Sequence, residues 1–356
     1  MRPSLWRLAR IVLLLILVYC IFSAATFTRN QARFQRFLAS QYITWDDFSP
    51  EYAIALHAKD EKMLQRDTFN YTLPFPQSDG IFAANDSIPR MIHFIWFKDL
   101  YKSRPGVTEI PSVGSNAPAL CESFNPGYTV KIWDATAARE LLEEHYAWFL
   151  PTYDGYKYPI QRIDALKCFV LWHYGGVYMD MDIACRRPLD PLLPFPAWFP
   201  EASPFGVNND LMAARAKHPL VLSMLESLAR RDKNLLFPYL TIFWSTGPQF
   251  ASDLVKEWYL EHDTVPTTNH SSKGEAGPDE WFVLPQEFYS EEFTFFAHSP
   301  GGTWHGDDVA VVLWFVAHPL VFWSIVGLVF GVPLGLVLRW KLNSRAQVRP
   351  RWATDV

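Results

Sequence analysis

Two acidic side chains, Asp180 and Asp182, follow a short apolar run that begins at Val177. Residues two apart in an extended chain point to the same side, so both carboxylates would face one ligand. Hard oxygen ligands of this kind suit Mg²⁺ or Mn²⁺ that carries a diphosphate. Two solvated acids at a strand end would show the same spacing, so the neighbouring elements must decide between a site and plain surface.

A second pair, Asp164 and Lys167, lies on the helix predicted over 161–174. Side chains three apart share one face of a helix, so this pair should point to the same strand end as the aspartates. The alternative is an exposed ion pair, worth roughly a few tenths of a kcal/mol. The site interpretation is favoured because the helix is strongly apolar, and because Gly175-Gly176 would let it pack closely against the next strand.

Short apolar strands alternate with helices along the chain, which predicts an α/β layered domain with a largely parallel sheet. Ligands of such sheets bind at the carboxyl ends of the strands. His93, inside the first strand, is expected to be a satisfied core histidine. We expect strands at 91–97, 128–133, 177–181, 211–214 and 281–284, and helices over 135–148, 161–174, 219–230 and 249–261.

Several blocks between residues 88 and 308 carry a family resemblance. They are IPRMIHFIWF (88–97), NPGYTVKIWD (125–134), YGGVYMDMD (174–182), NNDLMAARAKHP (208–219), STGP (245–248) and HSPGGTWHGDD (298–308). Together they resemble the Asp-x-Asp glycosyltransferases of family 32, and within it the fungal mannosyltransferases that act on inositol phosphorylceramide. The resemblance implies a GT-A fold, Rossmann-like with a mostly parallel sheet. It also implies a retaining transfer of mannose from the donor GDP-mannose to the acceptor inositol phosphorylceramide.

The resemblance implies roles at a metal, with Mn²⁺ or Mg²⁺ as cofactor. Asp180 would contact the ribose or the metal, Asp182 the metal directly, and His298 would be a third metal-side ligand. Asn209 or Asp210 could lie near the reacting face of the sugar, although a turn at a strand edge is the plainer explanation of both. A divalent cation that offsets the charge of the leaving diphosphate would then be the main catalytic factor.

Four further side chains are implied at the donor. Trp96 should stack on the nucleobase, and Trp304 should close over the diphosphate. Asp164 and Lys167 would grip the sugar and phosphate side of the donor. Lys167 stands where the family usually has an arginine, and a lysine keeps the charge but lacks the bidentate fork.

Two uncharged runs predict membrane helices, because each is long enough to span about 30 Å of hydrocarbon. The predicted divisions are a cytosolic tail (1–10), a signal-anchor (11–28), a luminal stem (29–87), the transferase domain (88–308), a second span (309–338) and a basic cytosolic tail (339–356). Basic residues after the second span place the C-terminus in the cytosol and the domain in the lumen. Small residues after the first run also suit signal peptidase, so a cleaved signal is the alternative. With the resemblance, we expect a Golgi membrane enzyme.

Charge is unevenly distributed along the chain. The two tails hold eight basic residues and one acid, whereas the middle has a net charge of −12. An acidic body disfavours a nucleic-acid partner. The expected partners are therefore the membrane, the donor, the lipid acceptor and a possible regulatory membrane subunit.

Other interpretations stay open at the level of sequence. The acceptor could be a protein-linked glycan or another glycolipid, with mannose or galactose as the sugar. A haloacid-dehalogenase-type phosphatase and a non-catalytic membrane partner are remote alternatives. Cys121, Cys168 and Cys185 permit at most one disulfide in the middle of the chain, and their spacing does not choose the pair.

Overall fold

The structure is a computed structural model. It describes residues 5–48, 87–98, 116–202, 206–262, 277–289, 295–298 and 308–331, together with 333 and 335. The chain forms two compact units, which are Met1–Leu236 with Leu240–Gly302, and Phe237–Tyr239 with Thr303–Val356. Trp304 lies outside the described residues, as do the Asn-x-Ser/Thr glycosylation acceptors Asn70, Asn85 and Asn269.

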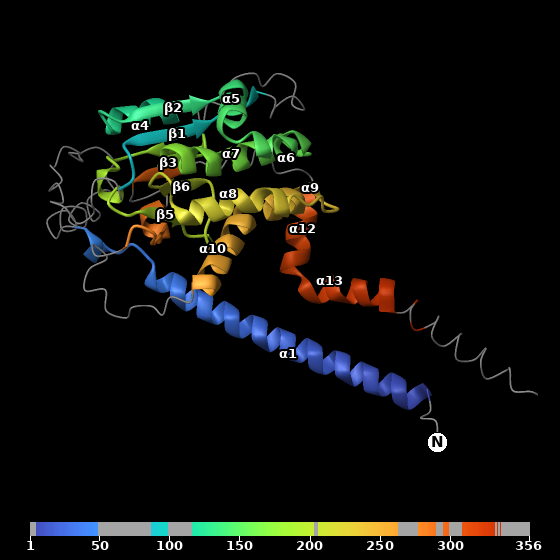
Figure 1. The fold of residues 1–356 in the computed structure, drawn as a ribbon. Coiled ribbons are helices and arrows are strands. Elements are labelled where there is room, and N and C mark those ends of the chain that lie inside the picture. Colours follow the sequence, from blue (N-terminus) through green and yellow to red (C-terminus); the bar gives the residue numbers. More distant parts are fainter. Residues whose placement is uncertain are drawn as a thin grey trace, which may run out of the picture. The chain divides into compact units, whose positions relative to one another are not determined.

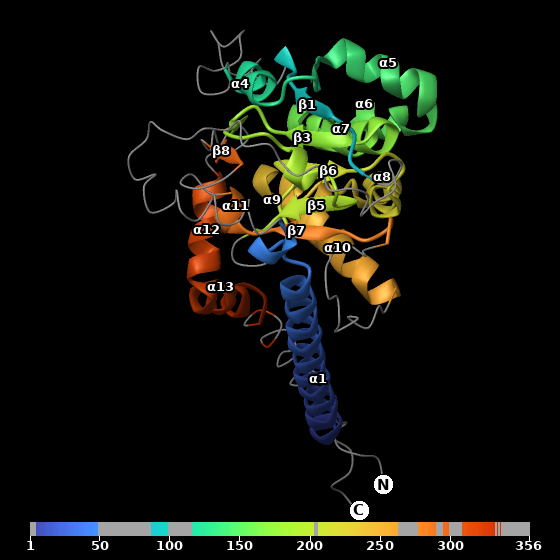
Figure 2. The same cartoon turned by 90° about the vertical axis from the view of Figure 1, so that its left-hand side faces the viewer.

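A six-stranded sheet forms the centre of the first unit, in the order β2-β1-β3-β6-β5-β7 (Figure 1 and Figure 2; β7 is labelled in Figure 2). The strands are β1 (Met91–Ile95), β2 (Thr129–Trp133), β3 (Gly176–Met179), β5 (Ala197–Pro200), β6 (Leu211–Ala214) and β7 (Phe282–Leu284). Neighbours are parallel at β1–β2, β1–β3 and β5–β7, and antiparallel on both sides of β6. The prediction of a mostly parallel α/β sheet is confirmed, while β5 is a strand that was not predicted.

Helices pack against the sheet, whose strands β3, β5, β6 and β7 are buried along their whole length, while β2 at the edge is partly exposed. The helices are α4 (Ala117–Phe124), α5 (Ala135–His145), α6 (Leu150–Gly155), α7 (Pro159–Tyr174), α8 (Pro219–Arg231), α9 (Pro238–Ser245), α10 (Pro248–His262) and α11 (Gln286–Tyr289). Helix α7 packs against α8 and against β3, and α10 also packs against α8 (Figure 2). All four residues of β3 are buried, which explains its unbroken apolar sequence.

Two glycines join α7 to β3. Gly175 and Gly176 have φ angles of 69° and 107°, in the region that favours glycine. A Cβ at Gly175 would lie 2.5 Å from the amide nitrogen of Ala216, and one at Gly176 would lie 2.6 Å from the carbonyl oxygen of Met91. The close approach predicted from Gly175-Gly176 is therefore confirmed.

His93 lies at the centre of the sheet and is fully buried. Its Nδ1 accepts the indole N–H of Trp133 at 3.1 Å, so the other ring nitrogen, Nε2, carries the proton and donates to the carbonyl oxygen of Gly175 at 2.8 Å. Burial lowers the pKa of His93 to about 4, which keeps the ring neutral. The prediction of a satisfied core histidine is confirmed.

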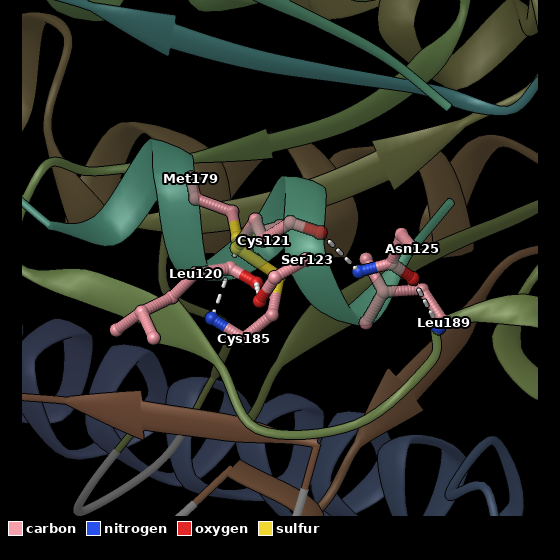
Figure 3. The surroundings of a disulfide bond; sticks show 7 residues. All are labelled: Leu120, Cys121, Ser123, Asn125, Met179, Cys185 and Leu189. Carbon is pink, nitrogen blue, oxygen red and sulfur yellow. Dashed lines mark hydrogen bonds between the residues drawn. A yellow bond between two sulfur atoms is a disulfide. The ribbon is translucent and has the colours of Figure 1, made fainter. Parts of the chain in front are cut away.

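A second, two-stranded sheet stands beside the main one. Strand β4 (Ile183–Cys185) pairs antiparallel with β8 (Phe296–His298), with Ile183 opposite His298. A disulfide between Cys121 and Cys185 ties α4 to β4, as Figure 3 shows, and Cys168 is a free, buried cysteine. The structure thus chooses one pair among the alternatives that the sequence left open.

The first helix, α1 (Leu5–Ser40), continues well past the apolar run at 11–28. At its end Phe37 stacks on Tyr259 of α10, with ring centroids 4.3 Å apart. The amide of Ile43 then donates to the carbonyl oxygen of Val283 at 2.9 Å, beside β7. Part of the segment predicted as a stem therefore contributes to the core of the first unit.

Among the described residues, no single helix is both long enough and apolar enough to cross a bilayer. Two helical pieces, Asp308–Ala317 and Leu320–Val329, are long enough and apolar enough together, across a bend of 99°. The bend coincides with Pro319, which has no amide hydrogen to continue the helix.

Candidate active site

The Asp-x-Asp pair lies between β3 and β4. The amide of Asp180 donates to the carbonyl oxygen of Asp210 at 2.7 Å, and the amide of Ile183 donates back to the carbonyl oxygen of Asp180 at 3.0 Å. That second bond closes a turn, so the expected extended geometry of Asp180 and Asp182 is wrong. The turn lets the two carboxylates reach different partners, one toward α7 and the other toward β8.

Asp180 faces a buried charged pair on α7. The Nζ atom of Lys167 lies 2.8 Å from Asp164 Oδ1 and 3.0 Å from Asp180 Oδ1, and it donates to the carbonyl oxygen of Asn209 at 3.1 Å. The predicted shared face of Asp164 and Lys167 is confirmed. The alternative of an exposed ion pair is wrong, because the Lys167 side chain is only 2% exposed and that of Asp164 only 6%.

The electrostatics of this pair follow from its burial. Burial alone would lower the pKa of Lys167, but the carboxylates of Asp164 and Asp180 raise it above its ordinary value. Burial raises the pKa of Asp164, against the effect of Lys167. Lys167 is therefore a buried cation whose position is fixed by its three partners. Its contact with Asp180 Oδ1 holds that carboxylate in a defined orientation.

Two residues complete the surroundings of Asp164. The hydroxyl of Thr246 donates to Asp164 Oδ2 at 3.1 Å, and Asn209 Nδ2 lies 3.4 Å from Asp164 Oδ1. Asn209 Nδ2 also donates to the carbonyl oxygen of Thr246 at 3.0 Å. Asn209, predicted from the sequence, thus lies beside the Asp164–Lys167 pair, and Thr246 comes from the STGP block without having been singled out.

Asp182 faces β8. Its Oδ2 lies 4.0 Å from His298 Nε2, and both side chains are partly exposed. The antiparallel pairing of β4 with β8 causes this approach, because Ile183 stands opposite His298. The structure therefore brings together Asp182 and His298, two of the three residues for which the resemblance implied a common metal, whereas Asp180 faces Lys167.

A tyrosine that the sequence did not indicate links this pair to β6. The hydroxyl of Tyr289, at the end of α11, lies 2.9 Å from His298 Nδ1 and donates to Asp210 Oδ2 at 2.5 Å. Asn208 Nδ2 donates to the same Asp210 oxygen at 2.6 Å. Burial, with a smaller effect of Asp180, raises the pKa of Asp210 to about 7.

The side chains around the Asp-x-Asp turn fit a divalent cation in their chemistry and spacing. Carboxylate oxygens and an imidazole nitrogen suit Mn²⁺ or Mg²⁺. Two ligands of one ion with bonds near ~2.1 Å stand about 3 to 4 Å apart, and the Asp182–His298 separation of 4.0 Å falls within that range. Over the described ranges, no three His, Cys, Asp or Glu side chains are grouped as a complete metal site. Asp182 and His298 fit such an ion as two of its ligands.

Two further residues, Trp96 and Trp304, were predicted to contact the sugar donor. Trp96 follows β1, is 9% exposed, and its amide donates to the carbonyl oxygen of Trp133 at 2.8 Å. Its stacking on a nucleobase stays a prediction. The same holds for Trp304, which lies outside the described residues.

The fold and the site together define a class. A mostly parallel sheet carries an Asp-x-Asp turn at the end of a central strand, with a buried Asp–Lys pair on one side and a histidine on the other. This is the arrangement of an α/β, GT-A-like glycosyltransferase, in which ligands bind at the strand ends.

Comparisons with known proteins agree with that class. Residues 111–198 match the family described as "Glycosyltransferase sugar-binding region containing DXD motif". Inositol phosphoceramide mannosyltransferase 3 of Schizosaccharomyces pombe is 31% identical over 84% of this chain and 77% of its own length. Mannosyl phosphorylinositol ceramide synthase SUR1 of Saccharomyces cerevisiae is 36% identical over 68% of this chain and 58% of its own length. Among solved structures, the PaToxG glycosyltransferase matches with a TM-score of 0.35 and 17% identity, over 55% of this chain and 80% of its own.

The chain belongs to the DXD-containing family of glycosyltransferases and is a glycosyltransferase. Family membership confirms the resemblance found in the sequence. It also decides against the phosphatase and the non-catalytic partner.

Proposed function

We propose that the enzyme transfers mannose from GDP-mannose to inositol phosphorylceramide, with retention of the anomeric configuration and with a divalent cation. The two relatives carry names that describe this acceptor and this sugar. The observation that carries the proposal is the approach of Asp182 to His298, next to an Asp180 held by a buried lysine. A protein-linked glycan or another glycolipid is the rival acceptor.

Different residues of the site would have different roles in the transfer. The cation, when bound, supplies positive charge that offsets the diphosphate as it leaves. Asp182 and His298 would hold it, and Lys167 pairs with the Asp180 carboxylate and orients it. Asp164 and Asn209 are proposed to contact the sugar, because both lie beside Lys167, which pairs with Asp180 of the turn. Mn²⁺ and Mg²⁺ are both suitable here.

The proposal is tested with membranes that contain the enzyme. They are incubated with GDP-mannose or another nucleotide sugar, with and without inositol phosphorylceramide, and the lipids are resolved. We expect mannosylated inositol phosphorylceramide only with GDP-mannose, and its loss after chelation of divalent cations. Membranes carrying Asp182→Ala serve as the matched control. Transfer to protein glycans with the lipid unchanged would favour the rival acceptor.

We also propose a Golgi membrane location, with the first unit in the lumen. Large apolar side chains of α1 are exposed to solvent, namely Leu14, Leu15, Val18, Tyr19, Ile21 and Phe22, and the bent pair at 308–329 is strongly apolar and contains no Asp, Glu, Lys or Arg after Asp308. A disulfide between Cys121 and Cys185 accords with an oxidising compartment. Both tails would then face the cytosol, and a regulatory membrane subunit would have two apolar helices to bind.

The topology is checked with sealed vesicles. Added protease should shorten the tails and spare the domain, and at least one of the Asn-x-Ser/Thr acceptors Asn70, Asn85 and Asn269 should carry a glycan. Detergent-opened vesicles are the control, in which the domain becomes accessible. Digestion of the domain in sealed vesicles would contradict the arrangement.

A further inference from the structure

We propose that Tyr289 and Asp210 position His298 by selecting its Nδ1–H tautomer, which leaves the lone pair of Nε2 directed to the side of Asp182. The proposal rests on the proposed function, in which Asp182 and His298 hold a divalent cation. Tyr289 is thus a positioning residue that acts through the histidine. It belongs to α11, which lies beside β8 (Figure 2).

The tautomer follows from counting protons. The tyrosine hydroxyl has one hydrogen and two close partners, Asp210 Oδ2 at 2.5 Å and His298 Nδ1 at 2.9 Å. The Asp210 oxygen already accepts the amide N–H of Asn208 at 2.6 Å, so it is an acceptor here and the tyrosine hydrogen goes to it. His298 Nδ1 must then supply the hydrogen that joins it to the tyrosine oxygen. A neutral imidazole protonated at Nδ1 has its lone pair at Nε2.

The Nδ1–H tautomer matters because it leaves Nε2 unprotonated on the side of Asp182. Nε2 stands 4.0 Å from Asp182 Oδ2, on the opposite side of the ring from Tyr289. A histidine can ligate a metal only through an unprotonated nitrogen, and a hydrogen bond at the other nitrogen fixes both its tautomer and its ring orientation. The opposite tautomer would direct a hydrogen toward Asp182 and close the site to a cation.

Burial makes this arrangement rigid. Tyr289 is 5% exposed, and its ring centroid lies 5.3 Å from that of His298. Asp210 lies directly before β6, and its backbone carbonyl accepts the amide of Asp180. The chain Asp210–Tyr289–His298 therefore connects the two ends of the Asp-x-Asp turn through a rigid route.

The test measures binding of Mn²⁺ alone to the full-length enzyme in detergent, by the electron paramagnetic resonance signal of free Mn²⁺. Tyr289→Phe removes only the hydroxyl, and we expect the Kd for Mn²⁺ to rise by about 10- to 100-fold. Tyr156→Phe is the matched control, because the hydroxyl of Tyr156 is buried and has no hydrogen-bond partner in the described part of the chain. That control should bind Mn²⁺ as the wild type does.

A double-mutant cycle separates positioning from general damage. If Tyr289 acts through the histidine, Tyr289→Phe should have no further effect on the Kd in a His298→Ala background. Thermal unfolding in EDTA should show a cooperative transition for both variants, with a lower midpoint for Tyr289→Phe, because only that variant loses a hydrogen bond to a buried carboxyl group. Asp210→Asn, which offers the tyrosine a weaker neutral acceptor, should raise the Kd in the same direction and does not depend on how well Tyr289→Phe folds.

Each outcome bears on the proposal. An unchanged Kd in both Tyr289→Phe and Asp210→Asn would overturn it, as would an equal effect of Tyr289→Phe with and without His298. Loss of binding in Asp182→Ala alongside an unchanged Tyr289→Phe would refute the positioning role and leave the proposed metal site standing. Absence of Mn²⁺ binding in the wild type would refute both.

Discussion

Replacement of Asp182 with alanine should lower the rate of sugar transfer by at least about 100-fold while the protein stays folded, because it removes one of the two ligands proposed for the catalytic cation. The side chain is one quarter exposed and lies in a turn, so its loss opens no cavity in the core. The measurement is the transfer rate at saturating donor as Mn²⁺ is titrated, together with the midpoint of thermal unfolding. We expect the midpoint to change little.

A surface carboxylate provides the control for this prediction. Asp279 is two-thirds exposed and pairs with Arg215 away from the turn, so Asp279→Ala should transfer sugar at the wild-type rate. The metal assignment fails if Asp182→Ala keeps near-normal turnover at limiting Mn²⁺. It also fails if both variants lose activity equally, since the loss would then reflect charge alone.

Replacement of Lys167 with methionine should destabilise the enzyme by about 3–5 kcal/mol, because it leaves a buried carboxylate without its cation. Asp164 would retain only the Thr246 hydroxyl and the more distant Asn209 amide, and Asp180 would lose its ion pair and retain the hydroxyl of Tyr178. The unfolding midpoint should fall by roughly 10 °C. Activity should fall as well, since Asp180 is then held by one side chain in place of two.

Two further variants identify the cause. Lys167→Arg keeps the positive charge in a larger side chain and should lose less stability than the methionine variant. Lys157 is an exposed lysine in the loop that precedes α7. Lys157→Met should change the free energy of unfolding by less than about 0.5 kcal/mol. If Lys167→Met were as stable as Lys157→Met, the buried pair would contribute nothing to the fold.

The local elements could be predicted from the sequence because their information is local. The apolar residues of β3 and α7 and the stop at Gly175-Gly176 define a strand and a helix without reference to the rest of the chain. The shared face of Asp164 and Lys167 follows from helical periodicity alone. The family, too, was evident from short motifs, because each motif is a run of neighbouring residues that can be read without the fold.

Strand direction and cysteine pairing were decided by tertiary structure. An apolar run such as 211–214 predicts a strand, but its sequence does not specify that β6 runs against both neighbours. Cys121 and Cys185 are 64 residues apart, and they meet only because α4 packs against β4. Such contacts depend on which elements pack together, and the periodicity of apolar residues along the chain does not specify the packing partner of an element.

The site shows the same division. The sequence and its family resemblance predicted a site of two carboxylates, an Asp–Lys pair and a histidine, and the types and spacings of these residues are determined by the sequence alone. Only the tertiary structure turned the Asp-x-Asp segment back on itself, buried Lys167, and placed Tyr289 against both Asp210 and His298. Tyr289 is 79 residues from Asp210, and nothing in the intervening sequence relates the two. The physical reason is that side-chain types and spacings are local properties, whereas burial and hydrogen-bond partners arise when distant segments pack in a common core.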